Sequence, residues 1–272
     1  MTDHTTTRGR AGRLRERLSD RDLEVLKTLY QLRLATSRHL QRLHVPDGSA
    51  RTRTRRTRAL LQRLSDLRLV VRMARTVGGT RSGSSAHIYG LSGLGLAVLN
   101  VQGPYGRRRR RVWETKPHFA RHVLAVTELA VSLTERSRPS AVDLVTFDGE
   151  PACWRPYPGP MGVPITLKPD AYVHVGVGEF ERHALIEMDM ATESLPSVRR
   201  KCASVIHYFN SGVEQGRRGI FPVVLWLVPS EHRQRQLEEV IADLETEYRH
   251  LFTVALQEDG PALLTAPVEV EA

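Results

Sequence analysis

Residues 50–67 of the chain, ARTRTRRTRALLQRLSDL, decide the fold of its N-terminal half. Leucine recurs at the spacing of one helix face, which predicts a helix over about 50–67. The core-facing residues of that helix are Leu60, Leu61, Leu64 and Leu67. Arginine occupies the opposite side, where Arg51, Arg55 and Arg58 form an outward stripe. The helix is therefore expected to have one apolar face and one cationic face.

Shorter elements surround this helix. Ser19 starts one helix with a capping-box pattern, and Thr36 starts a second that ends before Pro46. Downstream, the β-rich runs 69–76 and 86–91 flank a glycine-rich loop that carries Arg81, which predicts a hairpin. One more helix is expected at 92–101. Three short helices followed by a hairpin are typical of a winged helix-turn-helix domain, predicted over 19–102.

The charge of the chain is divided unevenly. Residues 1–112 contain 25 Lys and Arg against 7 Asp and Glu, whereas residues 113–272 contain 15 against 23. A strongly cationic half indicates a polyanionic partner, and we expect double-stranded DNA; the alternative is a half kept soluble by its charge. The run 51–58 has no acidic neighbour that could neutralise it. The predicted DNA contacts are Arg51, Arg53, Arg55, Arg56, Arg58 and Arg81.

Length and composition exclude several classes of protein. The 272 residues are 40% hydrophobic, enough for one large or two smaller folded domains, so general disorder is excluded. The longest apolar run, 223–228, is too short to span a bilayer, and the N-terminus lacks the apolar region of a signal peptide. Two cysteines exclude a disulfide scaffold and an all-cysteine zinc site. We expect a cytoplasmic protein without a membrane partner.

The second half is predicted as a mixed α/β domain over 117–257. Its expected order is helix, strand, strand, strand, helix, strand, helix, strand, at 118–136, 142–147, 165–177, 182–190, 196–209, 220–228, 230–248 and 252–256, with a proline- and glycine-rich passage at 150–164. Residues 103–116, with five successive arginines at 107–111, are predicted as a linker. The ends of the chain, a basic stretch at 1–18 and residues 258–272, are predicted as a disordered and a flexible tail. The fold class is therefore α/β (α+β), with a small DNA-binding domain in front.

Acidic residues mark the strand ends of this second domain. Asp170 follows Pro169, and Glu187 and Asp189 are two residues apart, so their side chains should share one face of a strand. Lys201 lies on the next helix. Clustered carboxylates suit a hard divalent cation, which activates water for attack on a phosphodiester. The alternative is that Asp170 is a turn residue and the other two are solvated strand ends.

Two motifs resemble known families. The string Pro169-Asp170 followed by Glu187-x-Asp189, in this order of elements, resembles the PD-(D/E)xK restriction-endonuclease-like fold. Together with the winged helix, the segment 186–209, IEMDMATESLPSVRRKCASVIHYF, resembles the replication-relaxation family, and the similarity covers roughly 19–256. The residues that match the family pattern are Glu187, Asp189, Thr192, Glu193, Ser194, Lys201 and Tyr208. The resemblance implies a part in plasmid replication, DNA relaxation and mobile elements, with replication or conjugation proteins as further partners.

Carried over residue by residue, the nuclease pattern implies Asp170 and Glu187 as metal ligands and catalytic residues, with Mg²⁺ or Mn²⁺ as cofactor. Asp189 is predicted as a further ligand and catalytic residue from its place beside Glu187 on the strand. Asp189 stands where the pattern usually has a lysine, and the resemblance implies that Lys201 supplies the ammonium from the next helix. The expected function is a DNA-binding, metal-dependent nicking nuclease. The alternative is a non-catalytic winged-helix regulator or initiator with a pseudo-nuclease domain. A homodimer would suit a palindromic DNA site.

Other candidate residues keep two interpretations each. Tyr208 could be a nucleophile that forms a phosphotyrosyl link, or an ordinary core aromatic. Glu128 could add a metal ligand, or be a solvated helix residue. His118 and His122, one helical turn apart, could bind a metal, although the sequence offers no third ligand.

Overall fold

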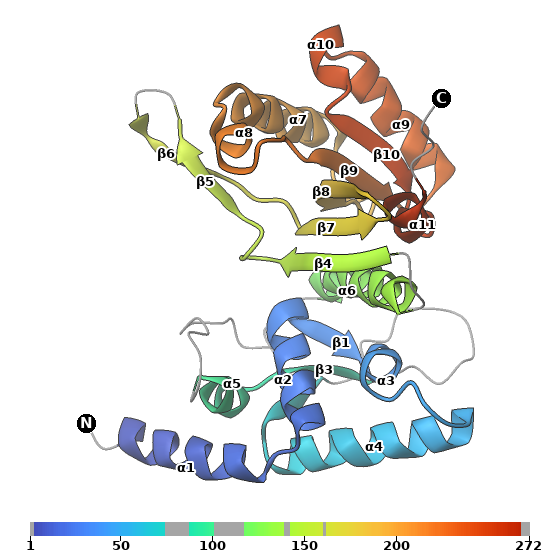
Figure 1. Cartoon of the computed structure of the whole chain (residues 1–272). Helices are drawn as coiled ribbons and strands as arrows, with labels where there is room; N and C mark the ends of the chain where they lie inside the picture. Colours follow the sequence, from blue (N-terminus) through green and yellow to red (C-terminus); the bar gives the residue numbers. More distant parts are fainter. Residues whose placement is uncertain (1–2, 74–86, 101–116, 139–141, 160–161, 268–272) are drawn as a thin grey trace. The chain divides into compact units, whose positions relative to one another are not determined.

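A computed structural model describes residues 3–73, 87–100, 117–138, 142–159 and 162–267 of the chain. Contacts divide the chain into two compact units, which we call unit 1 (1–131) and unit 2 (132–272) (Figure 1). The boundary falls inside helix α6 (Pro117–Ser137). The predicted linker, 103–116, lies outside the described residues. No described helix combines the length and apolar character that crossing a bilayer requires.

Unit 1 contains helices around a small antiparallel sheet. The helices before α6 are α1 (Asp3–Arg17), α2 (Asp20–Leu32), α3 (Ser37–His44), α4 (Ala50–Asp66) and α5 (Gly93–Leu99). The strands are β1 (Leu34–Thr36), β2 (Val70–Arg72) and β3 (Ile88–Leu91), in the order β1-β3-β2. Helices α2, α3, α4 and α5 lie where the leucine spacing and capping residues predict them. Strand β1 was not predicted, because three residues are too few to show a period.

The predicted helix starts are confirmed by their caps. At the start of α2, the Asp22 amide donates to Ser19 Oγ at 3.3 Å and Asp22 Oδ2 accepts from the Ser19 amide at 2.9 Å. At the start of α3, the His39 amide donates to Thr36 Oγ1 at 3.1 Å. Each cap satisfies amide groups that the first turn of a helix leaves without partners.

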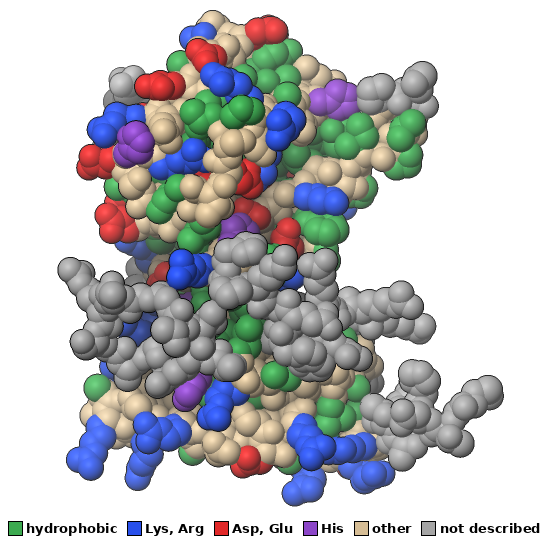
Figure 2. Space-filling view, turned by 180° about the vertical axis from the view of Figure 1, so that it is seen from behind, with side chains coloured by type: hydrophobic (Ala, Val, Ile, Leu, Met, Phe, Trp, Pro, Cys, Tyr) green, Lys and Arg blue, Asp and Glu red, His purple; other side chains and the backbone are tan. Residues whose placement is uncertain are grey.

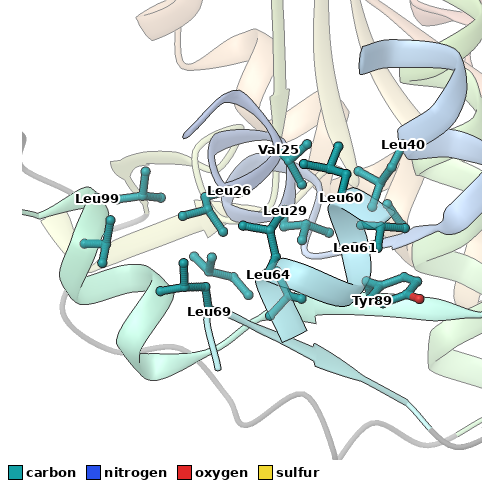
Figure 3. Packing of buried hydrophobic residues seen from close by; sticks show 14 of the residues in the cluster. Val25, Leu26, Leu29, Leu40, Leu60, Leu61, Leu64, Leu69, Tyr89 and Leu99 are labelled. Atoms are coloured by element: carbon teal, nitrogen blue, oxygen red, sulfur yellow. The ribbon is translucent and has the colours of Figure 1, made fainter. Parts of the chain in front are cut away.

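The core of unit 1 is built from the apolar faces of α2 and α4 (Figure 3). Leu60, Leu61 and Leu64 of α4 are buried as predicted, while Leu67 is only partly buried at the helix end. Other buried side chains in this cluster are Val25, Leu26, Leu29, Leu40, Leu69, Tyr89 and Leu99. With its leucines fixed in the core, α4 must turn its arginines outward.

The prediction that residues 1–18 form a disordered tail was wrong. They contain α1, which contacts α5 and buries Ala11 completely and Leu14 almost completely. These two apolar side chains share one helix face among many arginines, so a weak stripe is enough to attach the helix to the core. The prediction of a flexible tail at 258–272 was also wrong for its described part, since residues 260–265 form α11 (Gly260–Thr265) with Leu264 buried; residues 268–272 lie outside the described residues.

Unit 2 is a five-stranded mixed sheet with helices, in the strand order β10-β9-β8-β7-β4. The strands are β4 (Val142–Gly149), β7 (Ala171–Val177), β8 (Phe180–Met188), β9 (Val223–Val228) and β10 (Phe252–Leu256). The pairs β4–β7 and β7–β8 are antiparallel, whereas β8–β9 and β9–β10 are parallel. The helices after α6 are α7 (Leu195–Asn210), α8 (Val213–Arg218), α9 (Glu231–Ala242), α10 (Thr246–Arg249) and α11.

Three boundaries in unit 2 differ from the sequence prediction. The single strand expected at 165–177 is divided into β6 (Pro164–Leu167) and β7, because Pro169 lacks the amide that a strand ladder needs. The proline- and glycine-rich passage 150–164 contains β5 (Arg155–Pro158), which pairs with β6. The helix expected at 230–248 ends at Ala242 and is followed by the short α10.

One face of the sheet is covered by α7 and α9, which pack against each other. Buried residues of both helices form a cluster with Tyr172, Leu185 and Trp226 from the sheet. Glu187 is paired with Trp226 in the β8–β9 register, so it points to this same face. The fold thus places a carboxylate beneath two helices at the end of β8.

Candidate functional site

The site is built where β7 begins and β8 ends. The Asp170 amide donates to the Ile186 carbonyl at 2.9 Å, which extends the antiparallel β7–β8 pairing past Ala171. The Met188 amide donates to Asp170 Oδ2 at 2.8 Å. The first contact places Asp170 beside the end of β8, and the second fixes the orientation of its carboxylate.

Glu187 and Lys201 form an ion pair over this strand end. Lys201 Nζ on α7 donates to Glu187 Oε2 at 2.9 Å and lies 3.0 Å from Glu193 Oε1. The ammonium also lies 5.4 Å from the centroid of the Trp226 ring. Glu187 is buried, whereas more than a third of the Lys201 side chain is exposed. The lysine thus connects a buried carboxylate with solvent.

The charge of Asp170 contributes to the pKa shifts of both Glu187 and Lys201. Burial raises the pKa of Glu187 to about 8, the charge of Asp170 acts in the same direction, and Lys201 opposes both. Burial works against the ammonium of Lys201, but the carboxylates of Glu187 and Asp170 outweigh it and raise the pKa of Lys201 overall. The structure therefore brings together three of the four predicted residues: Asp170, Glu187 and Lys201.

Asp189 has a different partner. Its Oδ2 accepts from Arg233 Nε at 2.5 Å, and its Oδ1 accepts from the Ala191 amide at 2.7 Å. Arg233 also donates to the Glu193 carbonyl at 2.8 Å, and both members of the pair are almost fully buried. Asp189 thus ties the end of β8 to α9. Arg233 was missed in the sequence, where it is one of two arginines in the first turns of a capped helix and carries no distinguishing signal.

Tyr208 lies in the core of unit 2. Its ring is buried 4.8 Å from the centroid of Tyr157, and its hydroxyl donates to the buried carboxylate of Glu214. Burial, followed by this hydrogen bond, raises the pKa of Tyr208. A phenol that is buried and harder to ionise is a poor nucleophile, so these contacts favour the packing interpretation.

Glu128 belongs to unit 1 and has partners there. It lies 3.0 Å from His39 Nε2 and accepts from Arg42 at 2.6 Å. Burial would raise the pKa of Glu128, but the hydrogen bonds from His39 and Arg42 outweigh it and lower the pKa to about 2. Its role is to attach α6 to α3. The side chain of His118 lies outside the described part of the chain.

The cationic face of α4 is open. Arg51, Arg55, Arg56 and Arg58 are exposed, and Arg53 is half-buried with Nη1 3.5 Å from the Pro46 carbonyl. Arg63, further along the helix, is paired with Asp22 at 2.5 Å. Figure 2 shows Lys and Arg side chains along the edge at which Figure 1 draws α1 and α4. Arg81 falls in 74–86, outside the described residues.

Comparisons of the chain with known proteins identify the family to which it belongs. Neither the curated proteins nor the solved structures include a significant match to the chain. A model of the replication-relaxation family, in contrast, matches residues 26–224, which include α4, Asp170, Glu187 and Lys201. The match covers well over half of the 272 residues. The chain therefore belongs to the replication-relaxation family.

Proposed function

We propose that this protein binds double-stranded DNA of a plasmid or mobile element through unit 1 and nicks it with unit 2. Unit 1 acts as a winged helix with α4 as its recognition helix. Unit 2 acts as a restriction-endonuclease-like domain that uses Mg²⁺ or Mn²⁺. The observation that carries the proposal is the convergence of Asp170, Glu187 and Lys201 at one strand end. Membership of a family associated with plasmid replication supports it.

The DNA-binding part rests on the charge of α4. Arginine donates bidentate hydrogen bonds to phosphates and to guanine edges. Four exposed arginines of the helix are not engaged in ion pairs within the described residues. Helix α3 packs against α4 and precedes it by a short turn, as in a helix-turn-helix. These features support α4 as the element that meets the duplex.

The nuclease part of the proposal rests on the order of the strands and helices and on the carboxylate oxygens that could bind a metal ion. In unit 2 the antiparallel strands β4, β7 and β8 are followed by α7 and the parallel strand β9, which is the order expected for the PD-(D/E)xK fold; α6, which precedes them, lies mostly in unit 1. The residues fit a hard divalent cation, because two oxygen donors lie close enough for Asp170 to raise the pKa of the buried Glu187. Asp170 and Glu187 would hold the ion, which would supply Lewis-acid activation of water when bound.

The protein groups around those ligands have separate tasks. The backbone contacts of Asp170 fix its carboxylate before substrate arrives, which avoids reorganisation during the reaction. Lys201 reaches from the buried Glu187 toward solvent and is placed to stabilise negative charge on a phosphate. Glu193 holds the ammonium from its other side. Asp189 and Arg233 keep the strand end against α9.

A plasmid-nicking assay tests the proposal. Supercoiled plasmid carrying the native element is incubated with the protein and Mg²⁺ or Mn²⁺, and conversion to open circles is measured. We expect Asp170→Asn, Glu187→Gln and Lys201→Met each to abolish nicking, while Glu179→Gln, an exposed change on the β7–β8 turn, retains it. Nicking that persists in the Asp170→Asn/Glu187→Gln double variant would reject the assignment of the site.

The second candidate is a non-catalytic regulator or initiator with a pseudo-nuclease domain. It is favoured by Asp189, which stands in place of the usual lysine and is committed to Arg233. Lys201, in addition, already contacts two carboxylates. This candidate predicts salt-dependent binding of DNA by the wild-type protein without nicking under any metal condition.

A further inference from the structure

A second group of metal-ligating side chains lies near the turn of the β7–β8 hairpin. His174, Glu181 and His183 are the three such residues whose ligand atoms all lie within 4.8 Å of one another in the described part of the chain. The strand register pairs His174 with His183 and Gly176 with Glu181, so all three side chains point to one face. At about 3.3 Å per residue, His183 lies roughly 13 Å along β8 from Glu187. This group is therefore distinct from the Asp170–Glu187–Lys201 site.

The distances within the group suit a shared ion better than hydrogen bonds. Glu181 Oε2 lies 3.3 Å from Nε2 of His174 and 3.4 Å from Nε2 of His183, and only the second contact meets hydrogen-bond geometry. A charge-assisted N–H···O bond is shorter, at about 2.7–2.9 Å. Ligands at about 2.0–2.1 Å from a tetrahedral Zn²⁺ are separated from one another by roughly 3.3–3.4 Å. Two edges of the group therefore have the length that a zinc tetrahedron requires.

Of the two histidine Nε2 atoms near Glu181, the one of His174 lacks a hydrogen bond. Nε2 of His174 is buried and makes no hydrogen bond to any described residue. The rings of His174 and His183 are stacked 21° from parallel with centroids 4.0 Å apart, so at least one ring must turn for both in-plane Nε2 lone pairs to meet one ion. A buried polar atom without a hydrogen-bond partner is unfavourable and indicates a missing partner. Because that atom faces the carboxylate of Glu181, a cation between them would satisfy both groups.

The other histidine is held as a metal ligand usually is. His183 Nδ1 lies 2.7 Å from the hydroxyl of the buried Tyr172, and Arg218 Nη1 donates to the same hydroxyl at 3.0 Å. Ligating histidines typically use their second ring nitrogen in such a bond, which fixes the ring and leaves the first nitrogen for the metal. In the tautomer with the proton on Nδ1, the Tyr172 hydroxyl accepts from both Nδ1 and Arg218, and Nε2 of His183 has a lone pair for a metal. In the opposite tautomer the hydroxyl donates to Nδ1 and Nε2 donates to Glu181, so metal binding selects the first.

We propose that His174, Glu181 and His183 bind one Zn²⁺ ion, with water in the fourth position. Two imidazoles and one carboxylate suit zinc, whereas Mg²⁺ prefers an all-oxygen shell. The Glu181 side chain is two-thirds exposed, so the ion would be reached from solvent at the hairpin turn. Zinc there would cross-link neighbouring strands of the sheet and leave one position open to an exchangeable ligand.

Metal titration of the full chain tests this proposal. The protein is stripped with a chelator and titrated with Zn²⁺ in competition with a chromophoric chelator, and Co²⁺ is added to a second sample to read its tetrahedral absorption in the visible range. We expect one high-affinity ion per chain and a tetrahedral Co²⁺ spectrum. His174→Gln and Glu181→Gln should each weaken binding at least about 100-fold, since each removes a direct ligand.

Two further variants separate this site from its surroundings. Tyr172→Phe removes the hydroxyl beside His183 and should weaken Zn²⁺ about 10-fold while the fold is kept. The exposed Glu179→Gln, on the turn of the same hairpin, should leave Zn²⁺ affinity at the wild-type value. Absence of saturable Zn²⁺ binding would overturn the proposal. Equal affinity in wild type and in folded His174→Gln and Glu181→Gln would overturn it too, because the ion would then be bound elsewhere.

Discussion

Replacing Asp189 with asparagine tests whether the Asp189 carboxylate stabilises the fold, in contrast to the catalytic role proposed for the Glu187 carboxylate. Asparagine keeps the shape of Asp189 and can still accept from the Ala191 amide, but it leaves the guanidinium of Arg233 buried without its counter-charge. We therefore expect Asp189→Asn to destabilise unit 2, whereas Glu187→Gln should leave its stability nearly unchanged or higher and abolish nicking. The two carboxylates are two residues apart and yet should give opposite results.

The expected loss of folding free energy in Asp189→Asn follows from the burial of the Asp189–Arg233 pair. Breaking one partner of a buried ion pair costs about 3–5 kcal/mol. Arg233 keeps its contact with the Glu193 carbonyl, so the lower end, about 3 kcal/mol, applies here. For a domain of this size that corresponds to a fall in Tm of about 10 °C. The exposed pair Arg199–Asp243, which joins α7 to the residue that caps the end of α9, is the control, and Asp243→Asn should cost less than about 1 kcal/mol.

Chemical denaturation followed by circular dichroism measures these differences. The double variant Asp189→Asn/Arg233→Met should recover most of the lost stability, because it removes both charges from the buried position. If Asp189→Asn unfolds at the wild-type denaturant concentration and also loses nicking, Asp189 acts as a ligand or catalytic group, and its structural assignment is refuted.

Three other predictions concern unit 1. Arg55→Ala/Arg58→Ala should weaken DNA binding and reduce the slope of log affinity against log salt by about 2, measured by fluorescence anisotropy; an unchanged slope would show that α4 is not the contact helix. Because the pKa of Glu128 is lowered to about 2, the stability it contributes is present above about pH 4.5 and is lost as the pH falls toward 2. Glu128→Gln should flatten this part of the stability profile, with a loss of only about 1 kcal/mol at pH 7 because the side chain is half exposed. Gly95→Ala should unfold unit 1 at lower denaturant concentration, since its Cβ would lie 2.3 Å from the Leu69 carbonyl oxygen; wild-type stability would mean that α5 shifts freely.

The parts of the fold that the sequence predicts are those with a local cause. Helix α4 follows from leucine spacing, and the starts of α2 and α3 follow from Ser19 and Thr36. The errors come from tertiary contacts. Helix α1 is stabilised by burying Ala11 and Leu14 against residues far along the chain, and no local signal marks that packing.

In the candidate site, too, some features follow from the local sequence and others depend on tertiary contacts. Spacing at the strand ends predicts that Asp170 and Glu187 lie together, and the resemblance adds Lys201 from the following helix; the structure brings these three residues close to one another. Spacing also groups Asp189 with them, since alternation gives the face of a side chain but not its partner. The partner, Arg233, is 44 residues away on α9. The pairing of His174 with His183 likewise depends on the hairpin register, which the sequence leaves open.

The ion pair between Asp22 and Arg63 limits how α4 can be used. It binds the last arginine of the helix to α2, so the available positive charge is confined to the opening turns, from Arg51 to Arg58. At 1.5 Å per residue this segment is about 10 Å long, close to the roughly 12 Å width of a major groove. In the proposed complex with DNA, α4 should therefore enter the groove by its tip and not lie lengthwise on the backbone, and its footprint should cover only a few base pairs.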